Sequence, residues 1–255
     1  MALLLGTDIG AQSLKVGIMD EEGVLHAFAQ VPYSVQRPHL GWAEEDPEVW
    51  WASFCKAVKI AMERNSIRSD QIESIGISTM CPSLVAMDER GDSLRPAILY
   101  LDQRSLPQAK RIQEEIGLQE IFHITGNRIA PGTYSVTSML WMQENEPDLF
   151  RRTRCFGHGN TFLAHRLTGR LAFDWTNASF TGLFQTGTRR AWSDQLCHDL
   201  RIPLELLPSP VISSTCIGTL TERASRATEL PAGIPTLGPE SLNAPCSRAF
   251  ARIPR

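Results

Sequence analysis

Three short apolar segments separated by tight turns open the chain, and this feature most restricts the fold. Residues 3–9 are followed by an alternating run in which Leu14, Val16 and Ile18 share one side. A turn at residues 20–23 then leads to a third apolar run over residues 24–31. Alternation with period two and glycine-containing turns are typical of hairpin-linked strands. The pattern predicts an antiparallel meander and not a strand followed by a helix.

Helix-like and strand-like segments alternate after the meander. Asp46 suits an N-cap and Pro47 the first helical position, and a helical apolar face follows from Trp50 to Ala61. Helices are also predicted from Pro107 to residue 116 and over residues 137–145 and 160–167, and strands over residues 72–78 and 83–87. Residues 200–255 are rich in Pro and Ser and poorly periodic. The alternation predicts an α/β fold with a mixed sheet.

Composition excludes several classes of protein. The 255 residues include 25 Lys and Arg against 28 Asp and Glu, a net charge of −3 that gives no reason to expect nucleic acid or an anionic membrane. No apolar run approaches a membrane span, and residues 1–5 are too short for a signal peptide, so a cytoplasmic location is expected. The six cysteines are scattered without a CxxC pair, which predicts free thiols, mostly buried, and neither a disulfide framework nor a zinc site.

Residues 6–15, Gly-Thr-Asp-Ile-Gly-Ala-Gln-Ser-Leu-Lys, carry the clearest chemical signal. Asp8 ends the first strand, Gly10 opens a turn of small and polar residues, and Lys15 lies on the second strand. Successive backbone N–H groups in such a turn bind anions, Lys15 can neutralise a terminal phosphate, and Asp8 can hold Mg²⁺. These are the parts that phosphoryl transfer needs. The alternative is an ordinary hairpin turn with an exposed acid and base.

The chain resembles the FGGY family of carbohydrate kinases, in particular its xylulokinase-like members. The resemblance covers about residues 3–235 in an ordered series of blocks. The blocks are residues 6–10 with Asp20 and Gly23, residues 37–39, 41–44, 46–47 and 50–51, residues 94–104, 124–127, 140–147 and 167–169, and Asp174.

The resemblance implies a ribonuclease H-like, actin-like ATPase domain over residues 1–238, with a mixed sheet and helices on both faces, and an atypical tail over residues 239–255. It implies transfer of the γ-phosphate of ATP to a sugar hydroxyl, with Mg²⁺ held by Asp8. The residues expected near the phosphates are Asp8, Gly10, Ala11, Gln12, Ser13 and Lys15. The residues expected near the sugar are Ser83, Asp102 and Arg104.

Several positions depart from the family pattern. Where this chain has Ala11, Pro82, Leu101 and Ser138, family members often carry Thr, His, Asn and Lys, respectively. These differences weaken the expectation that xylulose is the substrate. Another pentulose, a hexulose or a polyol stays open. The family's catalytic aspartate is also missing: one alignment puts Leu242 at its position and another puts Glu240 there, so Glu240 is a weak candidate for the base.

The resemblance therefore favours the N-terminal half of a sugar kinase that lacks its C-terminal ATPase-like domain. The chain alone is expected to fold, to bind sugar weakly and to phosphorylate little or nothing. A homodimer stays open. The alternatives are a non-catalytic sugar-binding or partner-binding module and, less favoured, an actin-like or chaperone-like ATPase. Trp42 is the one tryptophan that could stack on a sugar, His158 is expected in a capping or loop role, and Asp174 walls the cleft or caps a turn.

Overall fold

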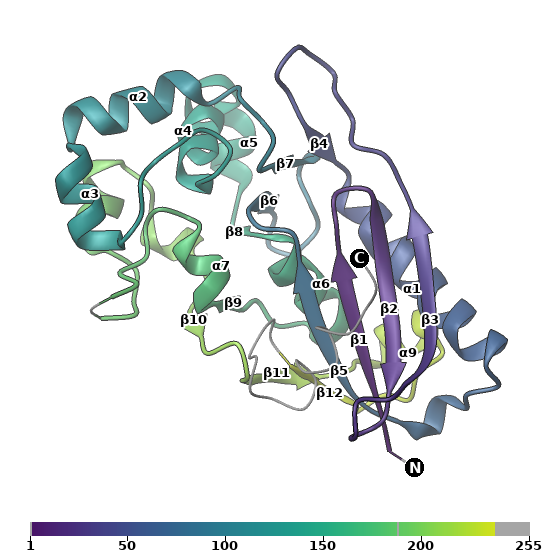
Figure 1. Ribbon diagram of the computed structural model, residues 1–255. Helices are drawn as coiled ribbons and strands as arrows, with labels where there is room; N and C mark the ends of the chain where they lie inside the picture. Colours follow the sequence, from purple (N-terminus) through teal and green to yellow (C-terminus); the bar gives the residue numbers. More distant parts are fainter. Residues whose placement is uncertain (1, 188, 238–255) are drawn as a thin grey trace.

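The computed structural model describes residues 2–187 and 189–237 (Figure 1). A six-stranded mixed sheet forms one side of the molecule, in the order β11-β12-β5-β1-β2-β3. Its strands are β1 (Leu3–Ile9), β2 (Ser13–Met19), β3 (Leu25–Pro32), β5 (Ile72–Thr79), β11 (Cys216–Thr219) and β12 (Pro235–Leu237). The strands β1, β2 and β3 form the predicted antiparallel meander, and β5 adds to β1 in parallel.

Two smaller sheets complete the strand architecture. The first has the order β4-β7-β6-β8 and contains β4 (Glu44–Glu45), β6 (Ser83–Met87), β7 (Ala97–Leu99) and β8 (Cys155–Gly157). The second pairs β9 (Phe173–Asp174) with β10 (Pro210–Val211) in parallel. The predicted α/β class with a mixed sheet is confirmed.

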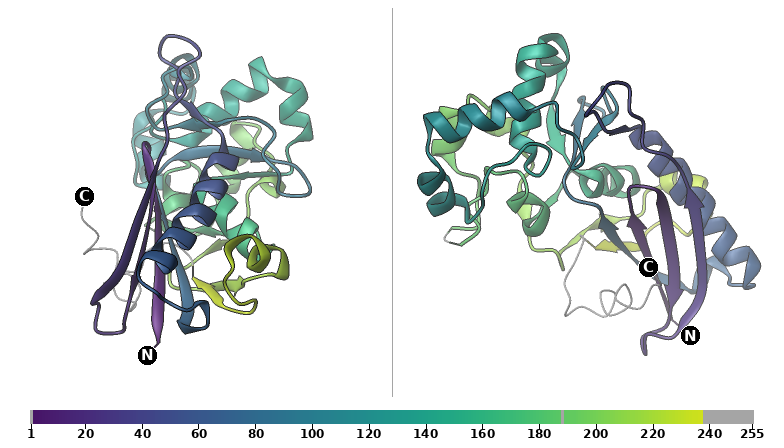
Figure 2. Two further views of the ribbon diagram at one scale, coloured as in Figure 1. Left: turned by 90° about the vertical axis from the view of Figure 1, so that its right-hand side faces the viewer. Right: turned by 45° about the horizontal axis from the view of Figure 1, so that its top comes forward.

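The helices divide between two regions of the molecule. Two helices, α1 (Pro47–Arg64) and α6 (Gly159–Thr168), pack on one face of the six-stranded sheet, and α9 (Glu222–Thr228) packs against both of them on the same side (Figure 2). The other α-helices are α2 (Leu106–Glu115), α3 (Leu118–Thr125), α4 (Ser135–Asn145), α5 (Pro147–Arg152), α7 (Trp175–Ser179) and α8 (Asp194–Asp199). Two 3₁₀ turns are η1 (Ser69–Gln71) and η2 (Leu204–Leu206).

The predicted start of α1 is confirmed in detail. The Asp46 side chain accepts a hydrogen bond from the Glu48 amide, and Pro47 occupies the first helical position, where its missing N–H costs nothing. Trp50, Phe54 and Ala57 are fully buried against the sheet. The helix thus forms from its local cap and is fixed by one apolar face.

Strand β6 separates two hydrophobic cores. Successive side chains of a strand point to opposite sides, and all five residues of β6 are buried. Val85 and Met87 join the core between the large sheet and α1 and α6, whereas Leu84 and Ala86 join a second core with α2 and α4. The small sheet therefore links the two regions into one packed body.

The segment from residue 200 to residue 237 contains more structure than its sequence indicated. It supplies β10, β11, α9 and β12, and β12 pairs in parallel with β5. These elements are short, between two and seven residues, so hydrophobic periodicity has little length in which to appear. Glu240 and the proposed tail over residues 239–255 lie outside the described residues.

The expectation that the cysteines are mostly buried is met only in part. Cys155 and Cys197 are buried, Cys55 and Cys81 are half-buried, and Cys216 is exposed. Cys246 lies outside the described ranges. The helices of the described chain include none with the length and hydrophobicity needed to cross a membrane.

Gly132 lets two loops approach each other, which gives a direct test of the packing. Its φ is +68°, and a Cβ there would lie 2.4 Å from the Asp102 carbonyl oxygen and 2.5 Å from that of Tyr100. We expect Gly132→Ala to destabilise the chain by about 3 kcal/mol or more, because the clash with backbone atoms adds to the cost of positive φ. Gly126→Ala is the control, since its φ is +73° but its Cβ would meet nothing within 4 Å. Equal loss of stability for the two variants in urea denaturation would contradict the close approach.

Candidate active site

Asp8 lies near the carboxyl end of β1, between two other strands of the large sheet. The antiparallel register places Asp8 opposite Lys15 on β2, and the parallel register places it beside Ser78 on β5. The Ser78 hydroxyl donates to the Asp8 carboxylate. Burial raises the pKa of Asp8, while the charge of Lys15 and the hydrogen bond from Ser78 act in the opposite direction. Three chemically different groups thus meet at one end of the sheet.

The turn after β1 is tied to its surroundings on several sides. Gly10 N donates to Ser13 O over 3.0 Å within the turn, and Met80 N donates to Ile9 O over 2.6 Å at its base. The Gln30 amide donates to Ser13 Oγ over 2.9 Å. A Cβ at Gly10 would approach Ser13 O to 3.2 Å, so the tight turn favours glycine. The turn is therefore a fixed shape and not a loose connection.

A cavity of about 590 Å³ opens over this turn. Its lining is shared between the turn and β2 on one side and the loops after β3 and β7 on the other. The lining residues are Gly10, Ala11, Gln12, Ser13, Lys15, Tyr33, Ser34, Val35, Arg37, Tyr100 and Leu101. All of the residues predicted near the phosphates, except Asp8, therefore line one cavity.

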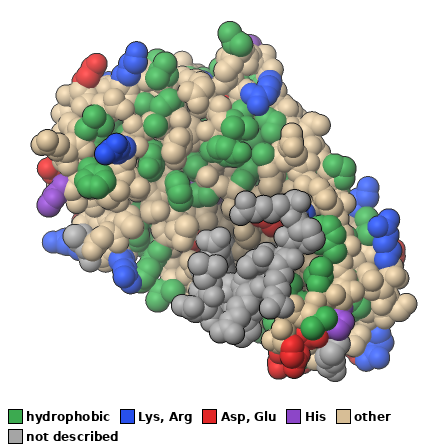
Figure 3. Space-filling view, in the orientation of Figure 1, with side chains coloured by type: hydrophobic (Ala, Val, Ile, Leu, Met, Phe, Trp, Pro, Cys, Tyr) green, Lys and Arg blue, Asp and Glu red, His purple; other side chains and the backbone are tan. Residues whose placement is uncertain are grey.

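The far wall of the cavity is apolar and partly open to solvent. Tyr100 and Leu101 expose 38% and 37% of their surface. Hydrophobic side chains gather on this part of the molecule, over β6 and β7 (Figure 3). The cavity is thus polar and cationic at the turn and apolar at the loop after β7.

Asp102 and Arg104 belong to a buried ionic cluster and do not line this cavity. The Arg104 guanidinium donates to both Asp102 oxygens, over 2.9 and 2.7 Å, and lies 2.7 Å from Glu44. It is stacked 3.6 Å from the Trp42 ring centroid. Asp102 also accepts from the Ala43 amide over 2.6 Å, so the cluster ties the loop at residues 41–43 to the loop that carries Tyr100 and Leu101. The Arg104 guanidinium therefore covers a face of the Trp42 ring.

Ser83, the third residue predicted near the sugar, is also internal. It is 1% exposed, and its Oγ accepts a hydrogen bond from Gly159 N at the start of α6. The structure therefore brings the phosphate-side residues together but places Ser83, Asp102 and Arg104 behind the cavity walls. The contacts of these three residues with a sugar stay predictions.

A smaller cavity of about 190 Å³ lies beside Asp8, at the carboxyl end of β5. Its lining is rich in hydroxyl and amide groups and consists of Ser78, Thr79, Cys81, Asp174, Thr176, Asn177 and Phe180. Asp174 both walls this cavity and caps α7, since its side chain accepts from Asn177 N over 3.0 Å. Burial raises the pKa of Asp174 to about 6.

His158 supports this wall from within the protein. It is fully buried, and its ring nitrogens lie 3.1 Å from Asn177 Oδ1 and 3.0 Å from Ser135 Oγ. Burial lowers its pKa to about 4, so the imidazole is neutral at neutral pH. His158 precedes α6 as predicted, but its side chain makes no cap to that helix. Its hydrogen bonds instead fix Asn177 at the cavity wall.

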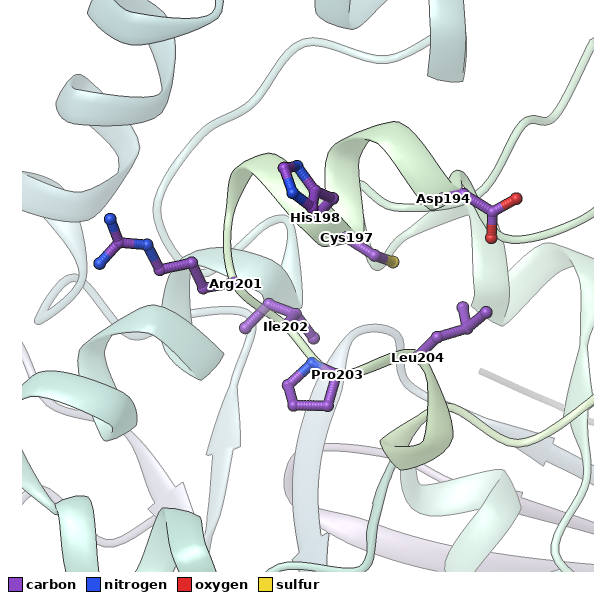
Figure 4. A pocket seen from close by; sticks show the side chains of 7 residues that line it. All are labelled: Asp194, Cys197, His198, Arg201, Ile202, Pro203 and Leu204. Carbon is purple, nitrogen blue, oxygen red and sulfur yellow. The ribbon is translucent and has the colours of Figure 1, made fainter.

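A different pocket, of about 380 Å³, lies around α8 and η2 (Figure 4). Cys197 and Leu204 point into its space, whereas Arg201 points away from it (Figure 4). Burial and the charge of Asp194 raise the pKa of Cys197 to about 11, so this thiol is not activated. The pocket shares no lining residue with the two cavities at the end of the sheet.

Three residues at the site were not predicted from the sequence, and they are Tyr33, Ser78 and Tyr100. Each of them reaches the site through the pairing of its segment with another part of the chain. The position of Tyr33 was accessible in principle, because the predicted hairpin register brings the end of β3 next to the turn. The positions of Ser78 and Tyr100 depend on which strands become neighbours, and local pattern does not give this.

Comparisons with known proteins identify the family of this chain. The sequence model of the FGGY family of carbohydrate kinases, N-terminal domain, matches residues 3–241. The chain is 29% identical over 230 residues to a xylulose kinase of Bacillus subtilis, and the aligned region covers 90% of this chain and 46% of that relative. It is 31% identical to a glycerol kinase of Thermococcus gammatolerans, over 89% of the chain and 46% of the relative.

The fold matches solved structures as well. The crystal structure of xylulose kinase from Rhodospirillum rubrum superposes with a TM-score of 0.88 at 24% identity, over 93% of this chain and 48% of that one. At this identity the similarity shows the fold. The chain spans about half the length of the curated relatives it matches.

Glu45, close to the site, provides a test of the burial described here. It is 2% exposed, its Oε2 accepts from Trp50 Nε1 over 2.6 Å, and its Oε1 has no hydrogen-bond partner in the described part of the chain. Burial raises its pKa from 4.5 to about 7. The unfolded chain therefore ionises at lower pH than the folded one, and the wild type should lose stability as the pH rises from about 4.5 to 7.

We expect Glu45→Gln to remove most of this pH dependence while keeping an acceptor for Trp50. At pH 8 the variant should be more stable than the wild type by about 2 kcal/mol, and at pH 4.5 the two should be similar. Thermal unfolding across this pH range measures both values, with the exposed Glu115→Gln as control. If the difference in stability between the wild type and Glu45→Gln were the same at pH 8 as at pH 5, the buried carboxyl would not be the cause of the pH dependence.

Proposed function

The chain belongs to the FGGY family of carbohydrate kinases, and we propose that its residues bind the terminal phosphates of ATP and the sugar whose hydroxyl accepts the phosphoryl group. The observation that carries the proposal is the position of Asp8 between Lys15 and Ser78, under a cavity lined by the turn. Positioning and charge compensation are the main catalytic requirements of phosphoryl transfer.

On the phosphate side, the turn offers backbone donors. In the described chain the amides of Ala11 and Gln12 have no hydrogen-bond partner in the protein, and both residues line the larger cavity. Backbone N–H groups of this kind stabilise phosphate oxygens without any change in protonation. Lys15 adds a positive charge to the same cavity.

Asp8 fits a magnesium ion in chemical terms. Mg²⁺ retains several waters and takes one or two carboxylates together with substrate phosphates, so a single carboxylate suffices. Asp8 is half-buried with a raised pKa, and a carboxylate in that state gains from a neighbouring cation. When bound, the ion would offset the charge that develops on the transferred phosphoryl group. Ser78 would hold the Asp8 carboxylate in place.

On the sugar side, the lining of the smaller cavity supports a polyhydroxylated substrate. Ser78, Thr79, Thr176 and Asn177 provide hydroxyl and amide groups that exchange hydrogen bonds with sugar hydroxyls. Tyr100, which lines the larger cavity, would form a further wall for the sugar, and Asp102 and Arg104 would hold the loop that carries it. The acceptor would be a pentulose, a hexulose or a polyol. The relatives include a xylulose kinase and a glycerol kinase, which are named for a pentulose and a polyol.

The proposal includes a partner domain. The relatives are about twice as long as the part that matches this chain, and a second ATPase-like domain would supply the adenosine site and a base for the sugar hydroxyl. Glu240, the weak candidate for that base, lies outside the described residues. The chain by itself would then bind its ligands and phosphorylate little or nothing.

Titration calorimetry with ATP tests the phosphate side. In Mg²⁺, Asp8→Asn should bind ATP about tenfold more weakly than the wild type, which corresponds to about 1.4 kcal/mol. In EDTA it should bind at least as well, because the substitution removes a negative charge that faces the phosphates. Asp148→Asn, in an exposed ion pair with Arg151, is the matched control and should behave as the wild type in both buffers. A loss for Asp8→Asn that persists in EDTA would argue against a metal-side role.

A coupled ADP-release assay across pentuloses, hexuloses and polyols, together with thermal shift, separates the kinase from a binding module. A sugar that raises the melting temperature of the chain without any ADP release favours either a binding module or one half of a kinase. Addition of the second domain of a relative distinguishes the two, because only the half of a kinase would then release ADP. Robust turnover by the 255-residue chain alone would contradict the need for a partner domain.

A further inference from the structure

One residue holds the phosphate turn at two points. Tyr33 follows β3, and its hydroxyl donates to the Gly10 carbonyl oxygen over 2.7 Å. Its backbone amide donates to the Gln12 carbonyl oxygen over 3.0 Å. Its ring also lines the larger cavity. Tyr33 thus binds two peptide groups of the turn, one through its side chain and one through its backbone.

The geometry of the trans peptide gives these two bonds a consequence. In a planar trans peptide the C=O and N–H groups point in opposite directions. The Gly10 carbonyl and the Ala11 N–H belong to one peptide plane, and the Gln12 carbonyl and the Ser13 N–H belong to another. Because Tyr33 binds both carbonyls, the two N–H groups are turned away from it. The Ala11 N–H is left free for a ligand, since no described group of the protein accepts from it.

The hydroxyl of Tyr33 is a permanent donor. Tyr33 is half-buried, and desolvation followed by the nearby carboxylates of Glu45 and Asp8 raises its pKa well above its ordinary value. The phenol therefore keeps its proton throughout the range in which the protein is handled. A hydrogen bond of 2.7 Å to a carbonyl requires that proton.

We propose that Tyr33 is a positioning residue for phosphate binding, which aims the Ala11 amide at the ligand by holding the Gly10 carbonyl. The inference rests on the proposed function, because it assumes that the turn binds phosphate. Tyr33 acts through the turn and makes no bond of its own to the phosphate. The side-chain bond to Gly10 can be removed alone, since the bond to Gln12 comes from the backbone.

Tyr33→Phe tests this role, because it retains the ring and its packing and removes one hydroxyl. We expect its affinity for Mg·ATP in calorimetry to fall roughly fivefold, the effect of one lost hydrogen bond on the orientation of the turn. The ratio of the wild-type and variant affinities should stay constant between about pH 6 and 9, as a permanently protonated phenol requires. Tyr134→Phe is the matched control, because its hydroxyl bonds Asn127 in a loop away from the turn.

Amide NMR of the ligand-free chains adds a readout that simple destabilisation does not move. The ¹⁵N order parameter of Ala11 should fall in Tyr33→Phe and stay unchanged in Tyr134→Phe, even where the two melting temperatures drop equally. Wild-type affinity in Tyr33→Phe, or an unchanged Ala11 order parameter, would overturn the inference and leave the proposed function intact. A wild type that does not bind Mg·ATP would overturn the proposed function itself.

Discussion

The structure depends first on the pairing of β1 with two neighbours of opposite direction. Its antiparallel partner β2 fixes Lys15 opposite Asp8, and its parallel partner β5 fixes Ser78 beside it. Because register in a sheet is set in steps of one residue, and one step turns a side chain to the other face, these three groups meet only in this pairing. The turn, the two cavities and the raised pKa of Asp8 all follow from it.

Local sequence patterns predicted much of this arrangement, but the pairing of segments that are distant in the chain could not be predicted from them. The meander, the Asp46 cap and the tight turn between β1 and β2 follow from patterns of a few residues, and all three have the expected form. The parallel pairing of β1 with β5 joins segments more than sixty residues apart, and no pattern within either strand specifies it. The short strands between residues 200 and 237 likewise form through pairing with other segments, since β10 pairs with β9, β11 with β12, and β12 with β5.

The pair Asp102 and Arg104 illustrates the same limit at the site. Its sequence context indicated residues near the sugar, and the structure gives both side chains internal partners in Glu44, Ala43 and Trp42. A buried charge of this kind is tolerated when its hydrogen bonds are satisfied, and removal of one partner is then costly. The cluster contributes to the cavity indirectly. It holds the loop that carries Tyr100 and Leu101, and these two residues form part of the cavity wall.

We propose that the phosphates of the nucleotide bind at the end of the large sheet and not in the pocket around α8 and η2. Hydrogen–deuterium exchange of the chain with and without Mg·ATP distinguishes the two places. Binding at the sheet should slow the exchange of the amides of residues 10–15, with smaller effects at residues 78–81. Exchange around the pocket of α8 and η2 should not change. Protection confined to that pocket, with no change in the turn, would exclude the turn as the phosphate site.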